Sequence, residues 1–196
     1  LVDPRQQVMG FGDALDVRSV ATRFRDIFRI RTARICYLAV LLEGIFLFGL
    51  FPYVALLLLA GGEPRASIAG LVIASFAVGG MVYSMSVGLL LTWLGQKRVM
   101  MAGGSLVGLG LVAVAFGPSW PVQCVAFAVM GLGFYMLHAS IQIFVTELAP
   151  ATRSSAVAFH TFSLFVGQGI GPISFGLGLA YLGASPQLPG GAVLVE

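Results

Sequence analysis

Charged residues are scarce in this chain, and their scarcity argues against a water-soluble fold. Asp, Glu, Lys and Arg make up 10% of the 196 residues, whereas hydrophobic residues make up 58% and the mean hydropathy is +0.97. Soluble domains carry about a quarter charged residues. A soluble core cannot bury such an apolar excess, but a lipid bilayer solvates apolar surface directly. The composition therefore predicts an integral membrane protein.

Cysteine and histidine are also scarce, with two of each. Cys36 and Cys124 lie in apolar runs without CxxC or metal-ligand spacing, so we expect packing roles and neither a disulfide nor a metal site. The chain lacks GxSxG, HExxH and phosphate-loop motifs, which carry hydrolytic and nucleotide chemistry. We therefore expect no enzymatic activity, no ATP hydrolysis and no cofactor.

Apolar runs long enough to cross a bilayer occur five times. A membrane helix needs about 20 predominantly apolar residues, and short polar, Gly or Pro signals separate the runs here. Pro52 predicts a kink near the far end of the first run. The predicted fold is an all-α, multi-pass bundle with spans at about residues 35–60, 67–94, 99–116, 121–146 and 156–182.

Basic residues predict how the spans are threaded. Every Lys and Arg except Arg65 falls in residues 1–34 or in later loops on the same side. Such loops remain in the cytoplasm, so we expect a cytoplasmic basic segment at 1–34 and a non-cytoplasmic tail at 183–196. Phe24, Ile27 and Phe28 have helical spacing, which leaves two interpretations: a surface helix near anionic headgroups or a solvated linker. Threading already explains the charge, so we expect no nucleic-acid binding.

Small residues spaced four apart predict close contacts between membrane helices, because they let two backbones approach. A proline beside such residues also predicts a hinge. The candidates are Gly80, Ser84 and Gly88 in the second span, Gly104 and Gly108 in the third, and Gly167, Gly171 and Pro172 in the fifth.

Glu43 is the only acid inside a predicted span. A carboxylate at this depth costs about 2.5–3.5 kcal/mol unless it faces protein or water. It is either a proton-coupling or solute-contacting acid, or a hydrogen-bonding residue of purely structural role. His160, near the cytoplasmic end of the fifth span, is more simply a packing residue, although imidazole suits proton exchange.

The fourth span carries polar residues on one face. Tyr135, His138, Gln142 and Thr146 are three or four residues apart and so form one helical stripe. The stripe predicts either a solute-facing wall or a set of interhelical hydrogen bonds. Gln168 in the fifth span could reach either the cavity or a neighbouring helix.

The turn Gly88–Arg98, GLLLTWLGQKR, resembles the loop signature of the major facilitator superfamily. Gly88, Gly95, Lys97 and Arg98 match that signature, which takes part in the cytoplasmic gate of the family. Thr92 stands where the family often has Asp, which puts a charge-based latch in doubt. Further along, ELAPATR at 147–153, FYMLH at 134–138 followed by Gln142, and FVGQ at 165–168 resemble the family's later loop and its tenth and eleventh helices.

The resemblance implies that the spans are helices seven to eleven, that residues 1–34 end the central loop, and that helix twelve is missing. In a competing register they are helices one to five, because Gly167-x-x-x-Gly171-Pro172 also resembles the antiporter motif of the fifth helix. The chain begins with Leu1 rather than Met, so we expect it to be a fragment that lacks the N-terminal half.

The function implied is secondary active transport of a small solute by alternating access in a plasma (inner) membrane, with proton-coupled efflux as one form. The implied partners are the lipid bilayer, the solute, protons and the missing half. Two alternatives stay open. One is a non-transporting membrane remnant. The other is an integral-membrane enzyme, which requires Glu43 and His138 to meet within hydrogen-bond reach on one membrane face.

Overall fold

The structure is a computed structural model that describes residues 25, 27–117, 119–148 and 150–182. Within these residues the chain is helical and has no strand, which confirms the predicted all-α membrane fold. The predicted tail at 183–196 and most of the basic segment lie outside the described residues. The elements are α2 (Arg31–Glu43), the π-helix η3 (Gly44–Phe48), the 3₁₀ helix η4 (Phe51–Tyr53), α3 (Val54–Ala60), α4 (Ala66–Ala115), α5 (Trp120–Leu148), the 3₁₀ helix η5 (Pro150–Thr152) and α6 (Arg153–Leu182).

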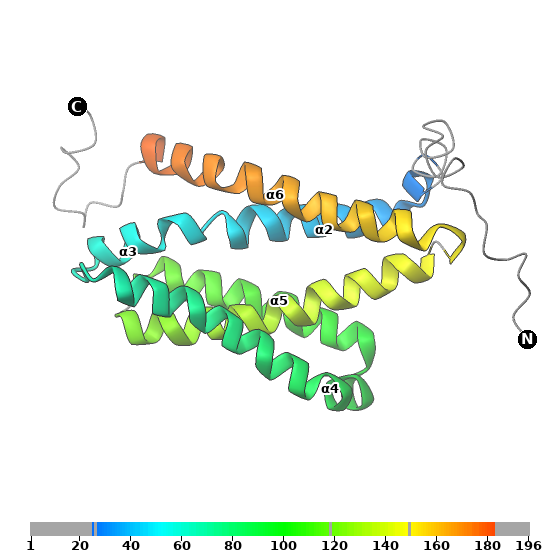
Figure 1. Ribbon diagram of the computed structural model, residues 1–196, viewed down its shortest axis with the longest axis horizontal. Coiled ribbons are helices and arrows are strands. Elements are labelled where there is room, and N and C mark those ends of the chain that lie inside the picture. The colour runs from blue at the N-terminus through cyan, green and yellow to red at the C-terminus, as the bar shows by residue number, and fades with distance from the viewer. Residues whose placement is uncertain (1–24, 26, 118, 149, 183–196) are drawn as a thin grey trace, which may run out of the picture.

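Helix α4 contains 50 residues but folds back on itself at Gly95 (Figure 1). Gly95 has φ 73° and ψ 159°, a backbone conformation that essentially only glycine adopts. A straight helix of this length would measure about 75 Å, far more than the roughly 30 Å hydrocarbon core of a bilayer. The two arms of α4 therefore act as two membrane-length helices, joined by the predicted basic turn.

The first span and α6 run parallel to each other (Figure 1). The Tyr37 hydroxyl donates a hydrogen bond to the Ala156 carbonyl at 3.4 Å, and the Tyr53 hydroxyl donates to the Pro172 carbonyl at 2.7 Å. Both pairs are 119 residues apart, so the two helices keep one register along their length. Membrane helices that run in the same direction must be separated by an odd number of crossings. The parallel direction of the first span and α6 thus agrees with three membrane crossings between them, two by α4 and one by α5.

Four glycines bring the first span and α6 into backbone contact. A Cβ on Gly44 would lie 2.8 Å from Gly167 Cα, and one on Gly171 would lie 2.7 Å from Gly49 Cα. Gly44 and Gly49 are five residues apart, and in an ordinary α-helix two residues at this spacing lie on different faces. The intervening π-helix, with its wider i→i+5 turns, places both glycines against α6.

The two arms of α4 pack against α5 through glycines one position away from some of those we predicted. A Cβ on Gly79 would overlap the Ala128 carbonyl oxygen, and one on Gly103 would lie 2.7 Å from the Gly133 oxygen. The prediction of a close backbone contact along Gly80, Ser84 and Gly88 is corrected accordingly. Gly80 instead makes room for the Tyr135 ring, and the Ser84 hydroxyl donates a hydrogen bond to the Gly80 carbonyl at 3.0 Å. An added Cβ on Gly88, or on Gly108 in the third span, would have no heavy atom within 4 Å. An added Cβ on Gly104 would have only the Leu137 side chain nearby, at 3.8 Å.

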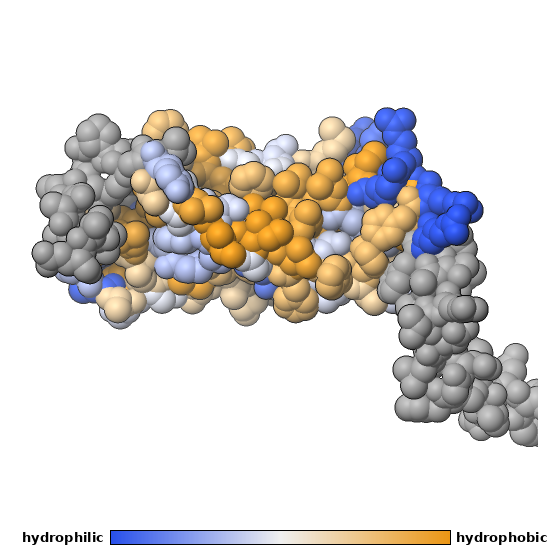
Figure 2. Space-filling view, turned by 90° about the horizontal axis from the view of Figure 1, so that it is seen from above, coloured by the Kyte–Doolittle hydropathy of each residue, from blue (hydrophilic) through white to orange (hydrophobic). Residues whose placement is uncertain are grey.

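The outer surface of the bundle is apolar along much of its length and hydrophilic at one end (Figure 2). Large side chains such as Met85 and Trp93 on α4 and Phe165 and Ile173 on α6 are exposed. In water such surface would drive aggregation, whereas lipid tails solvate it. The exposed side chains therefore support the membrane assignment independently of helix length.

Replacing Gly95 with alanine should destabilise the fold by about 1–3 kcal/mol, the usual cost of a non-glycine residue in this backbone region. No heavy atom lies within 4 Å of the added Cβ, so the effect isolates backbone strain from packing. Gly88→Ala is the matched control, because Gly88 is equally open but its φ is not positive. Thermal unfolding in detergent compares the two, and equal melting temperatures would contradict the assigned turn.

Candidate functional site

Glu43 and His138 meet in the interior of the bundle. Glu43 is the last residue of α2, and its Oε2 lies 2.7 Å from Nδ1 of His138, which projects from the middle of α5. Glu43 is only 6% exposed. A polar pair in such surroundings is stable because each partner satisfies the other. The carboxyl and the imidazole therefore form one hydrogen-bonded unit that joins two helices.

His160 on α6 brings a third titratable side chain to this pair. Its ring centroid lies 4.3 Å from that of His138, with 54° between the ring planes, and it is 0% exposed. Neither ring nitrogen of His160 has a hydrogen-bond partner, and neither does Oε1 of Glu43. We call Glu43, His138 and His160 the cluster. Its unpaired donors and acceptors lie in the protein interior, where a polar atom without a hydrogen-bond partner destabilises the fold.

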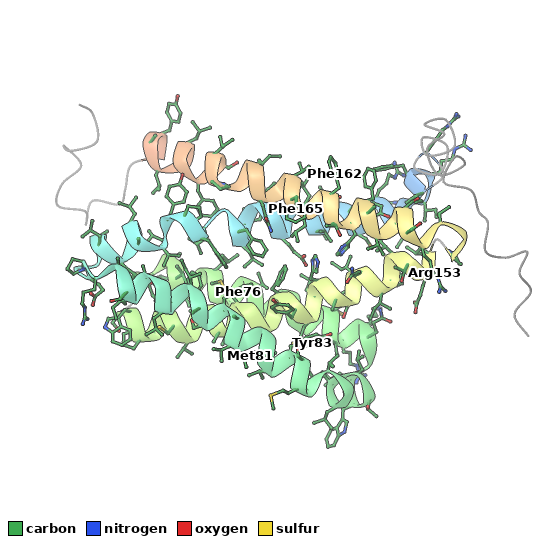
Figure 3. The ribbon with its side chains drawn as sticks, viewed as in Figure 1. Phe76, Met81, Tyr83, Arg153, Phe162 and Phe165 are labelled. Atoms are coloured by element: carbon green, nitrogen blue, oxygen red, sulfur yellow. The ribbon has the colours of Figure 1, made fainter. Side chains whose placement is uncertain are left out.

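Aromatic rings hold His138 in place. Phe134, one helical turn earlier on α5, stacks on the His138 ring with centroids 4.9 Å apart. Phe48 from the π-helix and Phe76 from α4 contact Phe134 in turn, at 5.3 and 5.6 Å. Phe76 lies in the layer between α4 and the first span (Figure 3). Phe134 therefore restricts the rotamers of His138, and the other two rings hold Phe134 in place.

The π-helix η3 begins directly after Glu43. Pi turns inside membrane helices are uncommon and occur often at functional sites. Here the wider turn lets Glu43, at the end of α2, contact α5 while the glycines that follow it contact α6. Pro52 falls beyond this segment in the 3₁₀ helix η4, so the span departs from α geometry earlier than the kink predicted at Pro52.

The other polar residues of the predicted α5 stripe do not share one environment. Tyr135 is 39% exposed and packs beside Phe76 and Phe134. Gln142 is half-buried, and the Thr146 hydroxyl donates to the Ile143 carbonyl of its own helix at 2.6 Å. Gln168 on α6 is also half-buried. Of the stripe, His138 is the residue that hydrogen-bonds to another helix in the described part of the chain.

The predicted gating turn is tied to α5 by an uncharged contact. Gln96 donates its Nε2 to the main-chain oxygen of Ser140 at 3.2 Å. The Thr92 hydroxyl bonds to the Gly88 carbonyl of its own helix, and Lys97 and Arg98 are exposed. Gln96 therefore makes the contact to a neighbouring helix, whereas Thr92 does not.

Outside the spans, Glu63 and Arg65 form an ion pair in the turn between α3 and α4. Arg65 Nε and Nη2 each lie 2.7 Å from a Glu63 oxygen. The hydrogen bonds from Arg65 lower the pKa of the Glu63 carboxyl below its ordinary value. In the described residues, no group of three or more His, Cys, Asp or Glu side chains is arranged to hold a metal ion.

Comparison with known proteins identifies the family. The family model described as "Major Facilitator Superfamily" matches residues 35–190. The chain belongs to the major facilitator superfamily. Two relatives of the chain are "Solute carrier family 2, facilitated glucose transporter member 2" of Rattus norvegicus and of Mus musculus, each 33% identical over 114 residues. The match covers 56% of this chain and 21% of each relative, and no solved structure matches the chain.

Both relatives are transporters by name, and the match covers about a fifth of their length. The depth of the cluster fits this class. Glu43 lies 12 residues beyond Arg31, the first residue of α2, which is about 18 Å at 1.5 Å per residue and close to the middle of a bilayer. The enzyme alternative required Glu43 and His138 to meet at a membrane face. They meet at 2.7 Å, but at mid-span.

Sequence reasoning missed two features of the site. The approach of His160 to His138 was missed because the two residues were assigned separately, one to a cavity stripe and one to a packing face. The contact of Gly44 and Gly49 with α6 was missed because their spacing is not four. The presence of both histidines in spans adjacent in sequence was the one available signal for the first feature.

Proposed function

We propose that this chain is the C-terminal half of a secondary transporter, with its spans as helices seven to eleven, and that it moves a small solute by alternating access together with an N-terminal half. The observation that carries the proposal is the 2.7 Å bond between Glu43 and His138, at mid-span and between two helices. Transporters of this kind hold their solute and coupling-ion sites near the bilayer midplane. Ionisable residues at that depth usually serve transport.

We further propose that the cluster exchanges a proton during the cycle. When Glu43 is ionised and His138 is protonated, the pair is neutral overall, and loss of one proton leaves a single negative charge. The two groups share a hydrogen bond, so a proton gained or lost by one changes the charge that faces the other. The free Glu43 Oε1 and the unprotonated ring nitrogen of His160 offer the next acceptors. Tyr135, Gln142 and Gln168 are the proposed solute-contacting residues around this centre.

The names of the relatives give the first solute to test. Both are described as facilitated glucose transporters, so a hexose is one candidate solute, and facilitated diffusion without protons is the second candidate mechanism. A pH gradient separates the two mechanisms, since only coupled transport accumulates solute against its gradient. Efflux of another small solute is tested in the same vesicles with the gradient reversed.

We also propose that the protein lies in the plasma (inner) membrane with its N-terminal end and the Gly88–Arg98 turn in the cytoplasm. The exposed Lys97 and Arg98 support this threading. A non-transporting remnant is the alternative. Complete absence of transport by a well-folded protein reconstituted with its N-terminal half would favour the remnant.

Glu43→Gln should abolish accumulation driven by a pH gradient. One pH unit corresponds to about 1.36 kcal/mol per proton, so a transporter that couples one proton to one solute accumulates about tenfold. The glutamine variant keeps side-chain size but cannot ionise, so its accumulation ratio should fall to about 1. Solute uptake into proteoliposomes, with glucose included in the panel, measures this ratio.

Glu63→Gln is the matched control, because Glu63 lies in the turn between α3 and α4 and contacts Arg65 rather than the cluster. It should keep the accumulation of the unmodified protein. Accumulation near tenfold by Glu43→Gln would contradict a coupling role for Glu43. Uptake by the unmodified protein that ignores the gradient would favour facilitated diffusion.

A further inference from the structure

The chain just before α2 is packed onto the bundle. Ile27 is 2% exposed, and the Phe28 ring lies 4.6 Å from that of Phe159 on α6 in an edge-to-face contact. Phe28 also lies 6.0 Å from Tyr37 on α2. A solvated linker makes no such contacts, so the described part of this segment is held at the end of the helical bundle where α2 and α6 begin.

Four arginines are displayed on this packed segment and on the first turn of α2. Arg25, Arg29, Arg31 and Arg34 are all exposed. The ion pairs in the described part of the chain involve other residues, so none of these four guanidinium groups has an acidic partner there. Figure 2 shows hydrophilic residues gathered at this end, directly beside apolar surface. Four like charges on one short segment repel one another and attract anions.

A stripe of exposed apolar residues continues from this basic group along α2. Ile35, Leu38 and Leu42 are exposed and lie four, seven and eleven residues after Arg31, which places them on the same helical face. These side chains are exposed in the described part of the chain and meet lipid tails if the chain spans a bilayer. Arg31 thus lies at the depth where lipid tails end and headgroups begin, and long arginine side chains reach into that layer readily.

We propose that Arg25, Arg29, Arg31 and Arg34 bind the headgroup of an anionic phospholipid, whose acyl chain lies along Ile35, Leu38 and Leu42. Guanidinium groups bind phosphate through paired hydrogen bonds. A headgroup with a net negative charge suits them better than a zwitterionic one, in which a cationic group neutralises the phosphate. The choice of the cytoplasmic leaflet rests on the threading proposed above. The binding itself requires only that this end of the bundle lies at a bilayer surface.

The test is lipid binding to the purified full chain in detergent, with phosphatidylglycerol compared with phosphatidylcholine by native mass spectrometry. Each basic residue near a membrane surface contributes about fivefold to the binding of anionic lipid. Arg31→Gln/Arg34→Gln should therefore lower the affinity for phosphatidylglycerol by roughly 25-fold, with little change for phosphatidylcholine. Lys97→Gln/Arg98→Gln is the matched control, because it removes the same charge from the distant turn of α4 and should leave binding unchanged.

Several results would overturn the lipid site. Equal losses in the two double variants would mean that overall charge, and not this site, attracts the lipid. Equal binding of the two lipids by the unmodified protein would contradict headgroup recognition. Displacement of phosphatidylglycerol by inorganic phosphate at similar concentration would indicate a site for free anions. Arg31→Lys/Arg34→Lys keeps the charge but loses the paired guanidinium hydrogen bonds, so its affinity should lie between those of the unmodified protein and the glutamine variant.

The lipid-binding experiment does not measure transport. A negative result would therefore count against the lipid site and not against the proposed function. Threading is measured separately by attaching a membrane-impermeant thiol reagent to a Lys97→Cys variant in intact cells. Labelling from outside the cell would contradict both the assignment of the lipid site to the cytoplasmic leaflet and the proposed threading. The absence of labelling in intact cells, with labelling after lysis, supports the inner leaflet.

Discussion

His138→Ala should destabilise the protein by at least about 1–3 kcal/mol, the usual cost of leaving a buried hydrogen-bonding group without its partner. The substitution leaves the nearly buried Glu43 carboxyl without its hydrogen-bond partner. It also removes the ring on which Phe134 stacks. Thermal unfolding in detergent, followed by a dye that reacts with the buried thiol of Cys36 as it becomes exposed, measures the effect.

A double-mutant cycle separates the pair from general packing. Glu43→Gln removes the ionisable group, so His138→Ala should cost less in the Glu43→Gln background than in the unmodified protein. The difference between the two costs is the coupling energy of the pair. If His138→Ala costs the same in both backgrounds, the carboxyl couples to His138 no more strongly than an amide does, and the proton-exchange role loses its support.

Gly167→Ala should destabilise the protein by about 1–3 kcal/mol or more, because overpacking against backbone cannot be relieved by a side-chain rotation. The new Cβ would overlap the Leu41 carbonyl oxygen and lie 2.9 Å from Gly44 Cα. The first span and α6 would have to separate, which would also weaken the contact of Tyr53 with the Pro172 carbonyl. The same thiol-reactive unfolding assay reports this change as a lower melting temperature.

Gly169 provides the matched control for this substitution. It lies two residues further along α6 and has no heavy atom within 4 Å of an added Cβ. Gly169→Ala should leave stability unchanged or raise it by up to about 1 kcal/mol, because alanine favours helix more than glycine does. A similar loss in both variants would contradict the assigned contact, because Gly169 does not touch Gly44 or Gly49.

The sequence was sufficient for those features that depend on local composition. Hydropathy alone indicated a helical membrane bundle, because long apolar runs have few alternatives in a protein of this composition. Gly95 was placed at a turn because a short basic loop separates two apolar runs there, and the structure gives it a positive φ. The family resemblance also followed from this turn and was confirmed by the match over residues 35–190.

The rotation of each helix about its own axis could not be predicted in the same way. In a soluble protein a polar face and an apolar face fix that rotation, but in a membrane the lipid-facing and protein-facing sides are both apolar. The backbone contact consequently fell on Gly79 instead of Gly80, a difference of one residue. Gly44 and Gly49 escaped notice for a related reason, since a π turn changes the spacing that places residues on one face.

The pairing of Glu43 with His138 has a consequence for biosynthesis. The two residues are 95 positions apart, so at a ribosomal rate of about 5–20 residues per second the acid is made some 5–20 seconds before its partner. During this interval the nascent first span must remain at the translocon or enter lipid with an unsatisfied carboxyl. Polypeptides that terminate before α5 should therefore be substrates for membrane quality control, however hydrophobic their spans are.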